Sequence, residues 1–236
     1  MVPHVALFVC LLCATFAAAA DIERAVLDGK TGRYGHDVLG GNEYAGLAAF
    51  SGDRVFRVDL PEDRVFEDIE ARLADVNGDG AADIVVVESS KQGGAELAVY
   101  SVTGDSLTKV AATPPIGRRN RWLAPAGIVD LNADGRLDIA YVEKPHIGGA
   151  LRIWTLRDGD LVEIARDPGY SNHRIGEDFI TGGVRACGNG PELILPDFRW
   201  RELLAVRLEG TTVLRRTIGQ DTGSRAVADA LACKTE

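Results

Sequence analysis

Two nonapeptides of the same pattern carry the residues of this chain that could do chemistry. Residues 75–83 read DVNGDGAAD and residues 130–138 read DLNADGRLD, so both fit D-x-N-x-D-G-x-x-D. Side-chain oxygens at positions 1, 3, 5 and 9, with the carbonyl at position 7, can surround a hard cation such as Ca²⁺. The glycine at position 6 permits the positive φ that turns the backbone around the ion. The pattern therefore predicts about two structural calcium ions, one in each loop.

The loops are not EF-hands, although their first six positions look alike. An EF-hand has a bidentate glutamate at position 12 and a helix on each side. Here position 12 is Val86 in the first loop and Tyr141 in the second, and residues 84–87 and 139–142 are short apolar runs of the strand type. The alternative is a solvated turn rich in Asp, Asn and Gly. Two copies that start 55 residues apart favour the metal loop.

The elements that must hold these loops are short strands. Gly and Asp clusters separate hydrophobic runs throughout, and no long stretch keeps a helical period, which indicates an all-β chain. Strands are expected at 72–75, 84–88, 96–102 and 107–111 around the first loop. The second unit matches it with strands at 127–130, 139–142, 151–156 and 161–165. Each metal loop therefore joins the first two strands of a four-stranded unit.

Two further units lack the aspartate pattern. The third has expected strands at 179–184, 192–195, 203–208 and 213–218, and its turn at 186–191 has no carboxylate, so we expect no metal there. The leading unit has expected strands at 35–39, 45–50 and 55–60, and residues 21–28 or the C-terminal tail could supply a missing strand. Units at about 28–68, 69–122, 123–176 and 177–233 predict a β-propeller-like array of about four four-stranded blades. An open array, or one completed by a homodimer, is the alternative.

Residues 73–80 and 128–135 resemble FG-GAP/VCBS repeats, the calcium-binding blades of propellers like those of integrin α-subunits. The resemblance extends over roughly residues 33–218, and the chain as a whole is similar to small exported proteobacterial VCBS-repeat proteins of unestablished function. It implies these calcium ligands: Asp75, Asn77, Asp79, the Ala81 carbonyl, Asp83, Asp130, Asn132, Asp134, the Arg136 carbonyl and Asp138. The first and last units depart from the family pattern, which bears on the blade count and not on the two loops.

Residues 1–20 are expected to be a secretory signal peptide. Residues 5–20 are apolar and end in an alanine run before Asp21, although no Lys or Arg precedes them; a retained membrane anchor is the alternative. Residues 21–236 would then form one periplasmic or secreted domain with no membrane span. The formal charge of −9 argues against binding nucleic acid. Cys187 and Cys233 could form a disulfide, although the sequence alone cannot show that they meet.

Four polar segments precede the inner strands, and in a closed propeller they would meet at one mouth. They are residues 33–37, 64–68, 118–122 and 172–178, which are rich in basic, aromatic and acidic side chains. Loops on a rigid scaffold often carry function, and arginine with aromatic residues favours recognition. The candidate ligand-binding residues are His36, Arg119, Arg121, Trp122, His173, Arg174 and Glu177. The alternative is that these residues tie neighbouring blades together.

The leading interpretation is an exported, calcium-stabilised propeller that acts as a binding or scaffold module for a protein or glycan partner. A propeller-fold hydrolase or lyase that uses the polar mouth is the rival, and a purely structural subunit is a third interpretation. No complete nucleophile, acid/base or metalloprotease motif occurs in the sequence, so no catalytic residue is assigned.

Overall fold

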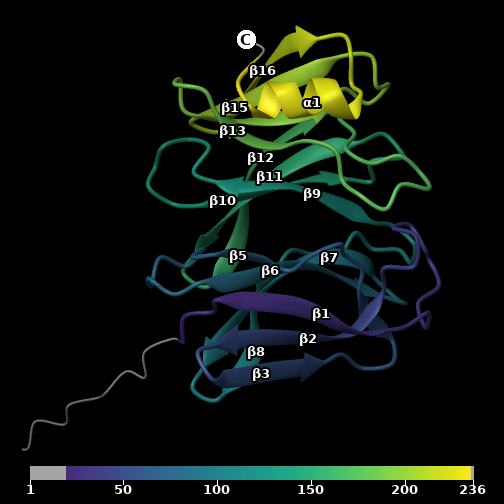
Figure 1. Ribbon diagram of the computed structural model, residues 1–236, viewed down its shortest axis with the longest axis vertical. Coiled ribbons are helices and arrows are strands. Elements are labelled where there is room, and N and C mark those ends of the chain that lie inside the picture. The colour runs from purple at the N-terminus through teal and green to yellow at the C-terminus, as the bar shows by residue number, and fades with distance from the viewer. Residues whose placement is uncertain (1–19, 235–236) are drawn as a thin grey trace, which may run out of the picture.

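The computed structural model describes residues 20–234 as strands with a single short helix, so the predicted all-β class is confirmed. Apart from Ala20, the expected signal peptide lies outside the described residues. No helix within residues 20–234 is long and apolar enough to cross a membrane. The strands stack in layers along the long axis, from the purple N-terminal strands to the yellow C-terminal end (Figure 1).

The strands of the first two units belong to one curled sheet. Its order is β1-β2-β4-β6-β7-β8, with β3 paired to β2 and β5 paired to β6. The bounds are β1 Arg24–Lys30, β2 Tyr44–Ser51, β3 Arg54–Asp59, β4 Arg64–Phe66, β5 Arg72–Ala74, β6 Asp83–Ser90, β7 Gly94–Thr103 and β8 Ser106–Ala112. The short strand β4 joins the two units because it pairs with both β2 and β6. β1 supplies the strand that the leading unit lacked.

Residues 35–39 do not form the strand that the sequence predicted. The buried carboxylate of Glu43 instead accepts hydrogen bonds from the amides of Gly35, His36 and Asp37, at 3.0, 2.8 and 3.2 Å. A carboxylate therefore takes the place of a neighbouring strand as their hydrogen-bond partner. Asp37 also has a φ of 55°, which ends any extended run.

The other two sheets are four-stranded antiparallel meanders, with orders β12-β11-β10-β9 and β13-β14-β15-β16. Their bounds are β9 Leu123–Val129, β10 Asp138–Glu143, β11 Ala150–Arg157, β12 Asp160–Pro168, β13 Gly183–Ala186, β14 Pro191–Pro196, β15 Leu203–Glu209 and β16 Thr212–Gly219. These strands follow the predicted second and third units in order, except that residues 179–182 are not in a strand. The arrangement of four-stranded sheets is propeller-like, as the repeat pattern predicted.

Alternate residues on the inner strands face opposite layers, because successive side chains of a strand point to opposite sides. In β6, Ile84 and Val86 pack toward the leading strands, whereas Val85 and Val87 pack toward the second sheet. β10 divides its side chains between the first and third sheets in the same way. This explains why both strands are buried along their whole length.

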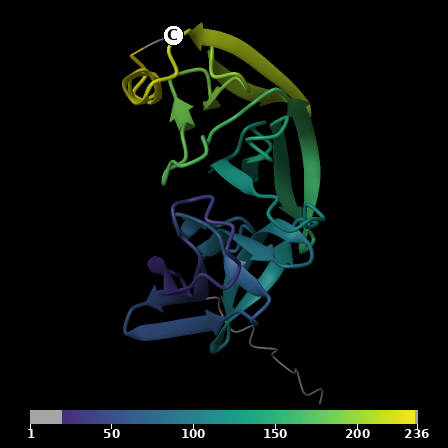
Figure 2. The same cartoon turned by 90° about the vertical axis from the view of Figure 1, so that its right-hand side faces the viewer.

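The layers form an open stack. β1, β2 and β3 lie at one end of the long axis and α1, Ser224–Leu231, lies at the other (Figure 1, Figure 2). The sequence did not predict this helix. It buries Val227 and Ala230 against Ile194 and Ala205 of the third sheet. The helix therefore covers the face on which a further layer would otherwise pack.

A disulfide ties the helix to the sheet that it covers. Cys187, in the turn between β13 and β14, is bonded to Cys233, which follows α1, and their Cα atoms are 5.6 Å apart. The third turn thus has a covalent bond in the unit position where the other two units have aspartates.

Candidate functional site

The first aspartate loop, between β5 and β6, is a compact turn. The carboxylate of Asp75 accepts hydrogen bonds from three backbone amides, those of Gly78, Asp79 and Gly80, at 2.7, 3.1 and 2.9 Å. Gly78 and Gly80 have φ values of 76° and 89°, which L side chains rarely adopt. The Asp and Asn side chains therefore fold this loop through local hydrogen bonds to their own backbone.

The second loop, between β9 and β10, repeats the first. The carboxylate of Asp130 accepts hydrogen bonds from the amides of Asp134 and Gly135, at 3.1 and 2.9 Å. Gly135 has a φ of 85° and Ala133 one of 58°. The two loops therefore share one backbone design although they belong to different sheets.

The last aspartate of each loop is buried at the first residue of the following strand. Asp83 begins β6 and accepts a hydrogen bond from the amide of Val76 at 3.1 Å. Asp138 begins β10 and accepts one from the amide of Leu131 at 3.0 Å. In each loop, a buried oxygen of the last aspartate is therefore hydrogen-bonded to the backbone amide of the second loop residue.

The remaining oxygen differs between these two aspartates. Ser101 on β7 donates its hydroxyl to Oδ1 of Asp83. At the matching place on β11, the hydroxyl of Thr155 instead contacts the carbonyl of Leu137 at 3.4 Å. Among the described residues, Oδ1 of Asp138 has no hydrogen-bond partner. A buried carboxylate oxygen without a partner is destabilising.

The negative charge of the second loop is concentrated. Burial raises the pKa of Asp138 to about 6, and the nearby carboxylates of Asp134 and Asp130 raise it as well. A divalent cation beside Asp138 would give its oxygen a partner and would offset the repulsion between the three carboxylates. The available donors are carboxylate, amide and carbonyl oxygens, which suit a hard cation such as calcium.

Within residues 20–234, no three carboxylate, histidine or cysteine side chains converge into a group that could hold a metal ion. In the first loop, the amide Nδ2 of Asn77 donates to Asp79 at 3.1 Å and to Asp83 at 3.4 Å. A donor group therefore lies between two carboxylates. A cation there requires Asn77 to turn its amide oxygen inward, which breaks the hydrogen bond that this oxygen accepts from the amide of Asp79 at 2.8 Å.

The four polar segments touch one another in chain order, and we call residues 33–37, 64–68, 118–122 and 172–178 the polar seam. Arg33 Nε donates to the carbonyl of Arg64 at 2.9 Å. The indole of Trp122 donates to the carbonyl of Glu67 at 2.9 Å and packs edge-on against the His173 ring, with centroids 5.0 Å apart. Each contact joins one segment to the next.

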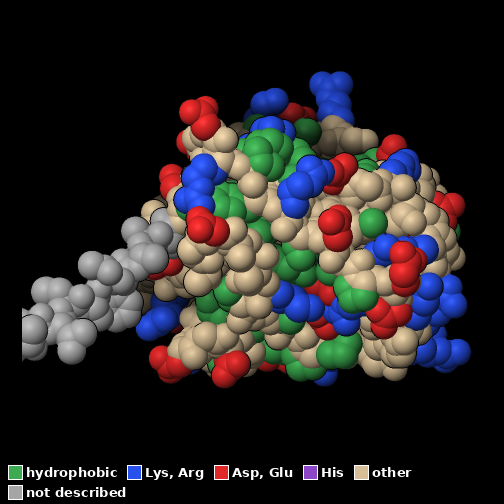
Figure 3. Space-filling model, turned by 90° about the horizontal axis from the view of Figure 1, so that it is seen from below, with side chains coloured by type: hydrophobic (Ala, Val, Ile, Leu, Met, Phe, Trp, Pro, Cys, Tyr) green, Lys and Arg blue, Asp and Glu red, His purple; other side chains and the backbone are tan. Residues whose placement is uncertain are grey.

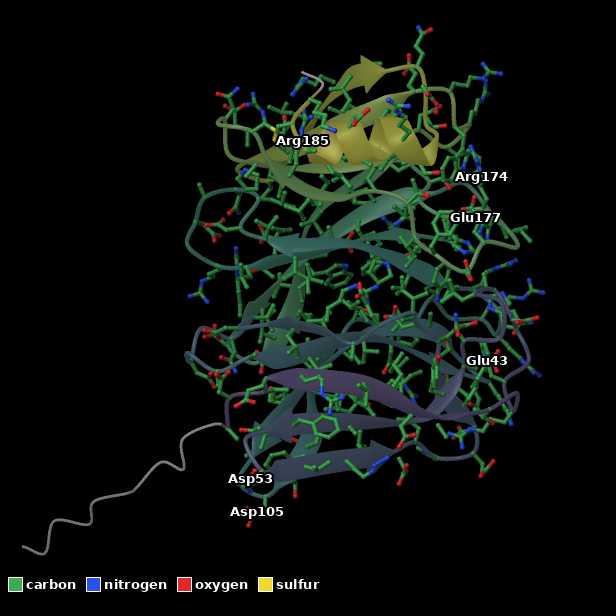
Figure 4. The ribbon with its side chains drawn as sticks, in the orientation of Figure 1. Glu43, Asp53, Asp105, Arg174, Glu177 and Arg185 are labelled. Carbon is green, nitrogen blue, oxygen red and sulfur yellow. A yellow bond between two sulfur atoms is a disulfide. The ribbon has the colours of Figure 1, made fainter. Side chains whose placement is uncertain are left out.

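Because the stack is open, the seam does not surround a channel. Figure 4 shows Arg174 and Glu177 of the last segment on the same side of the stack as Glu43, whose carboxylate holds the first segment. The seam therefore runs along one side of the layers. A mouth formed by a closed ring, one of the interpretations offered by the sequence, is not the arrangement of the described residues.

Two buried carboxylates hold the N-terminal half of the seam. One is Glu43, and the other is Glu67, whose Oε1 is 2.6 Å from Nδ1 of His36. The hydroxyl of Ser89 donates to the second oxygen of Glu67 at 2.6 Å. Burial raises the pKa of Glu67, while the contacts of His36 and Ser89 lower it. Because these groups are satisfied internally, His36 is better placed to join two units than to bind a ligand.

A pair of neutral histidines lies at the other end of the seam. His146 Nε2 is 2.8 Å from His173 Nδ1, and His173 Nε2 is 2.9 Å from the carbonyl oxygen of Glu177. Since a carbonyl only accepts, His173 carries its proton on Nε2, and its Nδ1 accepts from His146. Burial lowers the pKa of both rings, to about 4 for His146. The sequence alone does not predict this pair, because 27 residues separate the two histidines.

Because the pKa of His146 is lowered from 6.5 to about 4, we expect the free energy of unfolding to fall as the pH is lowered through this range. In that window the unfolded chain binds a proton at His146 that the folded chain excludes, so acid favours unfolding. Urea unfolding at several pH values measures the slope. His146→Gln keeps a donor toward His173 and should flatten it. The same slope in the variant would contradict the assignment.

The other candidate residues lie toward the surface of the seam. Arg119 donates to a backbone carbonyl of the first segment. Arg174 stacks over the ring of Trp200, 4.0 Å from its centroid, and its amide donates to Glu177 at 3.2 Å. The side chain of Arg121 has no hydrogen bond or ion pair within residues 20–234. The seam thus combines internal contacts with a few side chains that are free to meet a partner.

Trp122→Phe should lower the free energy of unfolding by about 1–2 kcal/mol, because it deletes the hydrogen bond to the Glu67 carbonyl between two units. The indole is buried, so water cannot replace the lost donor. Arg121→Ala is the adjacent control, and a change at such a surface position should stay within about 0.5 kcal/mol. Urea denaturation compares the two variants. Equal effects would argue against a structural role for this contact.

Residues 75–141, which include both aspartate loops, match the family of FG-GAP-like repeats. The chain contains an FG-GAP-like repeat. The resemblance that rested on the two loops is therefore confirmed. On a propeller-like arrangement of one eight-stranded and two four-stranded sheets, this FG-GAP-like repeat indicates a β-propeller-type binding module.

No curated protein matches this chain. A solved complex of the fission yeast SREBP–SCAP binding domains is similar over 94% of this chain and 57% of that chain, with 12% sequence identity and a TM-score of 0.40. This chain thus spans a little more than half the length of that one. A TM-score this low supports no argument about function.

Proposed function

We propose that this FG-GAP repeat protein is an exported module, periplasmic or secreted, which calcium stabilises and which binds a protein or glycan partner. The observation that carries the calcium part is the buried Oδ1 of Asp138, which has no partner among the described residues. The repeat itself supports the binding part, since it indicates a β-propeller-type binding module.

Calcium would supply positive charge to two loops that are otherwise rich in carboxylates. The residues that would hold it in the second loop are Asp130, Asn132, Asp134, the Arg136 carbonyl and Asp138, and in the first loop Asp75, Asn77, Asp79, the Ala81 carbonyl and Asp83. In both loops, backbone amides already orient the carboxylate of the first aspartate. A filled loop would fix the turn between two inner strands.

The partner surface that fits best is the exposed side of the polar seam near its C-terminal end. Ile175 there is 82% exposed, and it adjoins Arg174, which stacks on Trp200. Arginine and aromatic side chains dominate binding at many interfaces. Arg121 adds a cation with no partner within residues 20–234. These side chains can change without disturbing the buried contacts of the seam.

Two measurements test the two parts separately. Metal analysis and calorimetric titration of chelated protein with CaCl₂ should find about two bound ions per chain. For the partner, the immobilised protein is exposed to a glycan array and to envelope proteins, with calcium or with EDTA. Arg174→Ala should reduce capture while leaving the melting temperature nearly unchanged. Absence of bound calcium would overturn the first part, and capture unaffected by Arg174→Ala would overturn the second.

A further inference from the structure

The outer face of the last sheet is divided into two halves. One half lies under α1, where Ile194, Leu203 and Ala205 pack against the helix. The other half is hollowed into a pocket of about 590 Å³. Pockets of this size accept small ligands. The helix thus leaves half of the face open.

This pocket is basic on an acidic protein. The chain has 35 Asp and Glu against 26 Lys and Arg. The pocket lining reverses this balance, with Arg185, Arg207, Arg215 and Arg216 against the single carboxylate of Glu192. We call it the arginine pocket. The opposite end of the molecule, formed by β1, β2 and β3, instead shows charged side chains of both signs interspersed (Figure 3).

One carboxylate serves two of these guanidinium groups. Arg185 is 1% exposed and donates to Glu192 through Nη2 at 2.8 Å, while Arg216 donates to the same oxygen at 3.1 Å. Arg207 makes no side-chain hydrogen bond or ion pair within residues 20–234. Arg215 lies 3.3 Å from Asp167, which does not line the pocket. Positive charge therefore exceeds negative charge inside the pocket, and one guanidinium has all its donors available.

The disulfide and the third turn form part of the wall of this pocket. Cys187, Cys233, Asn189 and Gly190 line it, and Figure 4 shows Arg185 beside the sulfur atoms at the C-terminal end of the molecule. The turn occupies the unit position of the two aspartate loops but carries no carboxylate. Leu214 adds an apolar surface. The third unit thus keeps the strand order of the others and reverses the charge beside its turn.

We propose that the arginine pocket binds the acidic groups of a glycan, either carboxylates or sulfates. Guanidinium groups bind oxyanions through paired hydrogen bonds, and such charge-assisted bonds are strong. The amide of Asn189 and the apolar side chain of Leu214 offer contacts to hydroxyl groups and to the C–H face of a sugar. This inference goes beyond the proposed function, because no residue of the polar seam lines the arginine pocket. It does not depend on calcium.

The test compares four probes by calorimetry: a sulfated heparin hexasaccharide, an oligogalacturonate, neutral maltohexaose and tripolyphosphate. We expect one or both acidic sugars to bind, with an affinity that weakens as salt is added, and maltohexaose not to bind. Arg207→Gln together with Arg216→Gln should weaken binding by about tenfold or more, because two charged donors are lost. Arg216 is half exposed, and Arg185 still pairs with Glu192 in this variant, so folding should be kept.

Arg225→Gln is the control. It makes the same Arg→Gln change once, on α1, where the side chain is 97% exposed and lies outside the pocket. Its affinity should equal that of the unmodified protein. Binding of tripolyphosphate without either sugar would overturn the glycan assignment, and no binding of any anion would overturn the pocket as a site. The melting temperature of the same samples is also measured in calcium and in EDTA. This measurement tests the calcium proposal separately from the arginine pocket.

Discussion

Removal of calcium by EDTA should lower the melting temperature of this protein by about 10–20 °C, and excess calcium should restore it. A ligand present at about a hundredfold its dissociation constant stabilises by about 2.7 kcal/mol for each site. Two loops would then contribute about 5 kcal/mol, and each kcal/mol moves the midpoint of a chain of this size by about 2–4 °C. Differential scanning fluorimetry in EDTA, calcium and magnesium measures the shift in melting temperature. Magnesium should be weaker, because it requires a stricter octahedral geometry.

The Asp138→Asn and Asp83→Asn variants identify the loop responsible. Asp138→Asn should remove roughly half of the calcium-dependent shift. In EDTA it should be neutral or stabilising, since it removes the buried negative charge whose Oδ1 has no partner among the described residues. Asp83→Asn should destabilise the protein even in EDTA, because Asp83 already accepts hydrogen bonds from Ser101 and the Val76 amide. Identical melts in EDTA and calcium, with no metal in the purified protein, would count against both calcium loops.

Loss of the disulfide should cost about 4 kcal/mol in the free energy of unfolding, because the bond closes a loop between residues 46 apart in the sequence. The effect should be large because α1 has only eight residues. Isolated helices of this length are marginal. The double variant Cys187→Ser, Cys233→Ser is compared with the unmodified protein by urea denaturation, with and without dithiothreitol.

Reductant should destabilise the unmodified protein and leave the double variant unchanged. If the thiols do not pair in the purified protein, the reductant will have no effect on either protein. The double variant should also weaken binding of an acidic sugar, since Cys187 and Cys233 line the arginine pocket. Circular dichroism separates the two effects, because loss of α1 would reduce the small helical signal.

The aspartate loops could be predicted from the sequence because the hydrogen bonds that form them lie within a few residues. In each loop the first aspartate accepts hydrogen bonds from amides four and five residues further on, so a short stretch contains what is needed to form the turn. The inner strands could be predicted for a different reason. β6 is apolar at successive positions because layers pack on both of its faces.

Contacts between distant segments decided the features that the sequence did not predict. The repeat pattern predicts a strand at residues 35–39, but the Glu43 carboxylate binds the amides of residues 35–37. α1 is stabilised because it buries Val227 and Ala230 against the outer face of the last sheet. The histidine pair and the Glu67 network join residues that lie 22 to 31 positions apart. Such pairings depend on how the layers stack, and no short pattern encodes them.

The sequence by itself determined the all-β class, the repeated four-stranded unit and the two aspartate turns, because each depends on side-chain alternation or on hydrogen bonds within a few residues. Only the tertiary structure decided that the stack is open, that Cys187 meets Cys233, and that Asp83 has a hydroxyl partner at Oδ1 where Asp138 has none among the described residues. Those outcomes depend on which strand lies beside each loop, and that is fixed by packing of the whole chain.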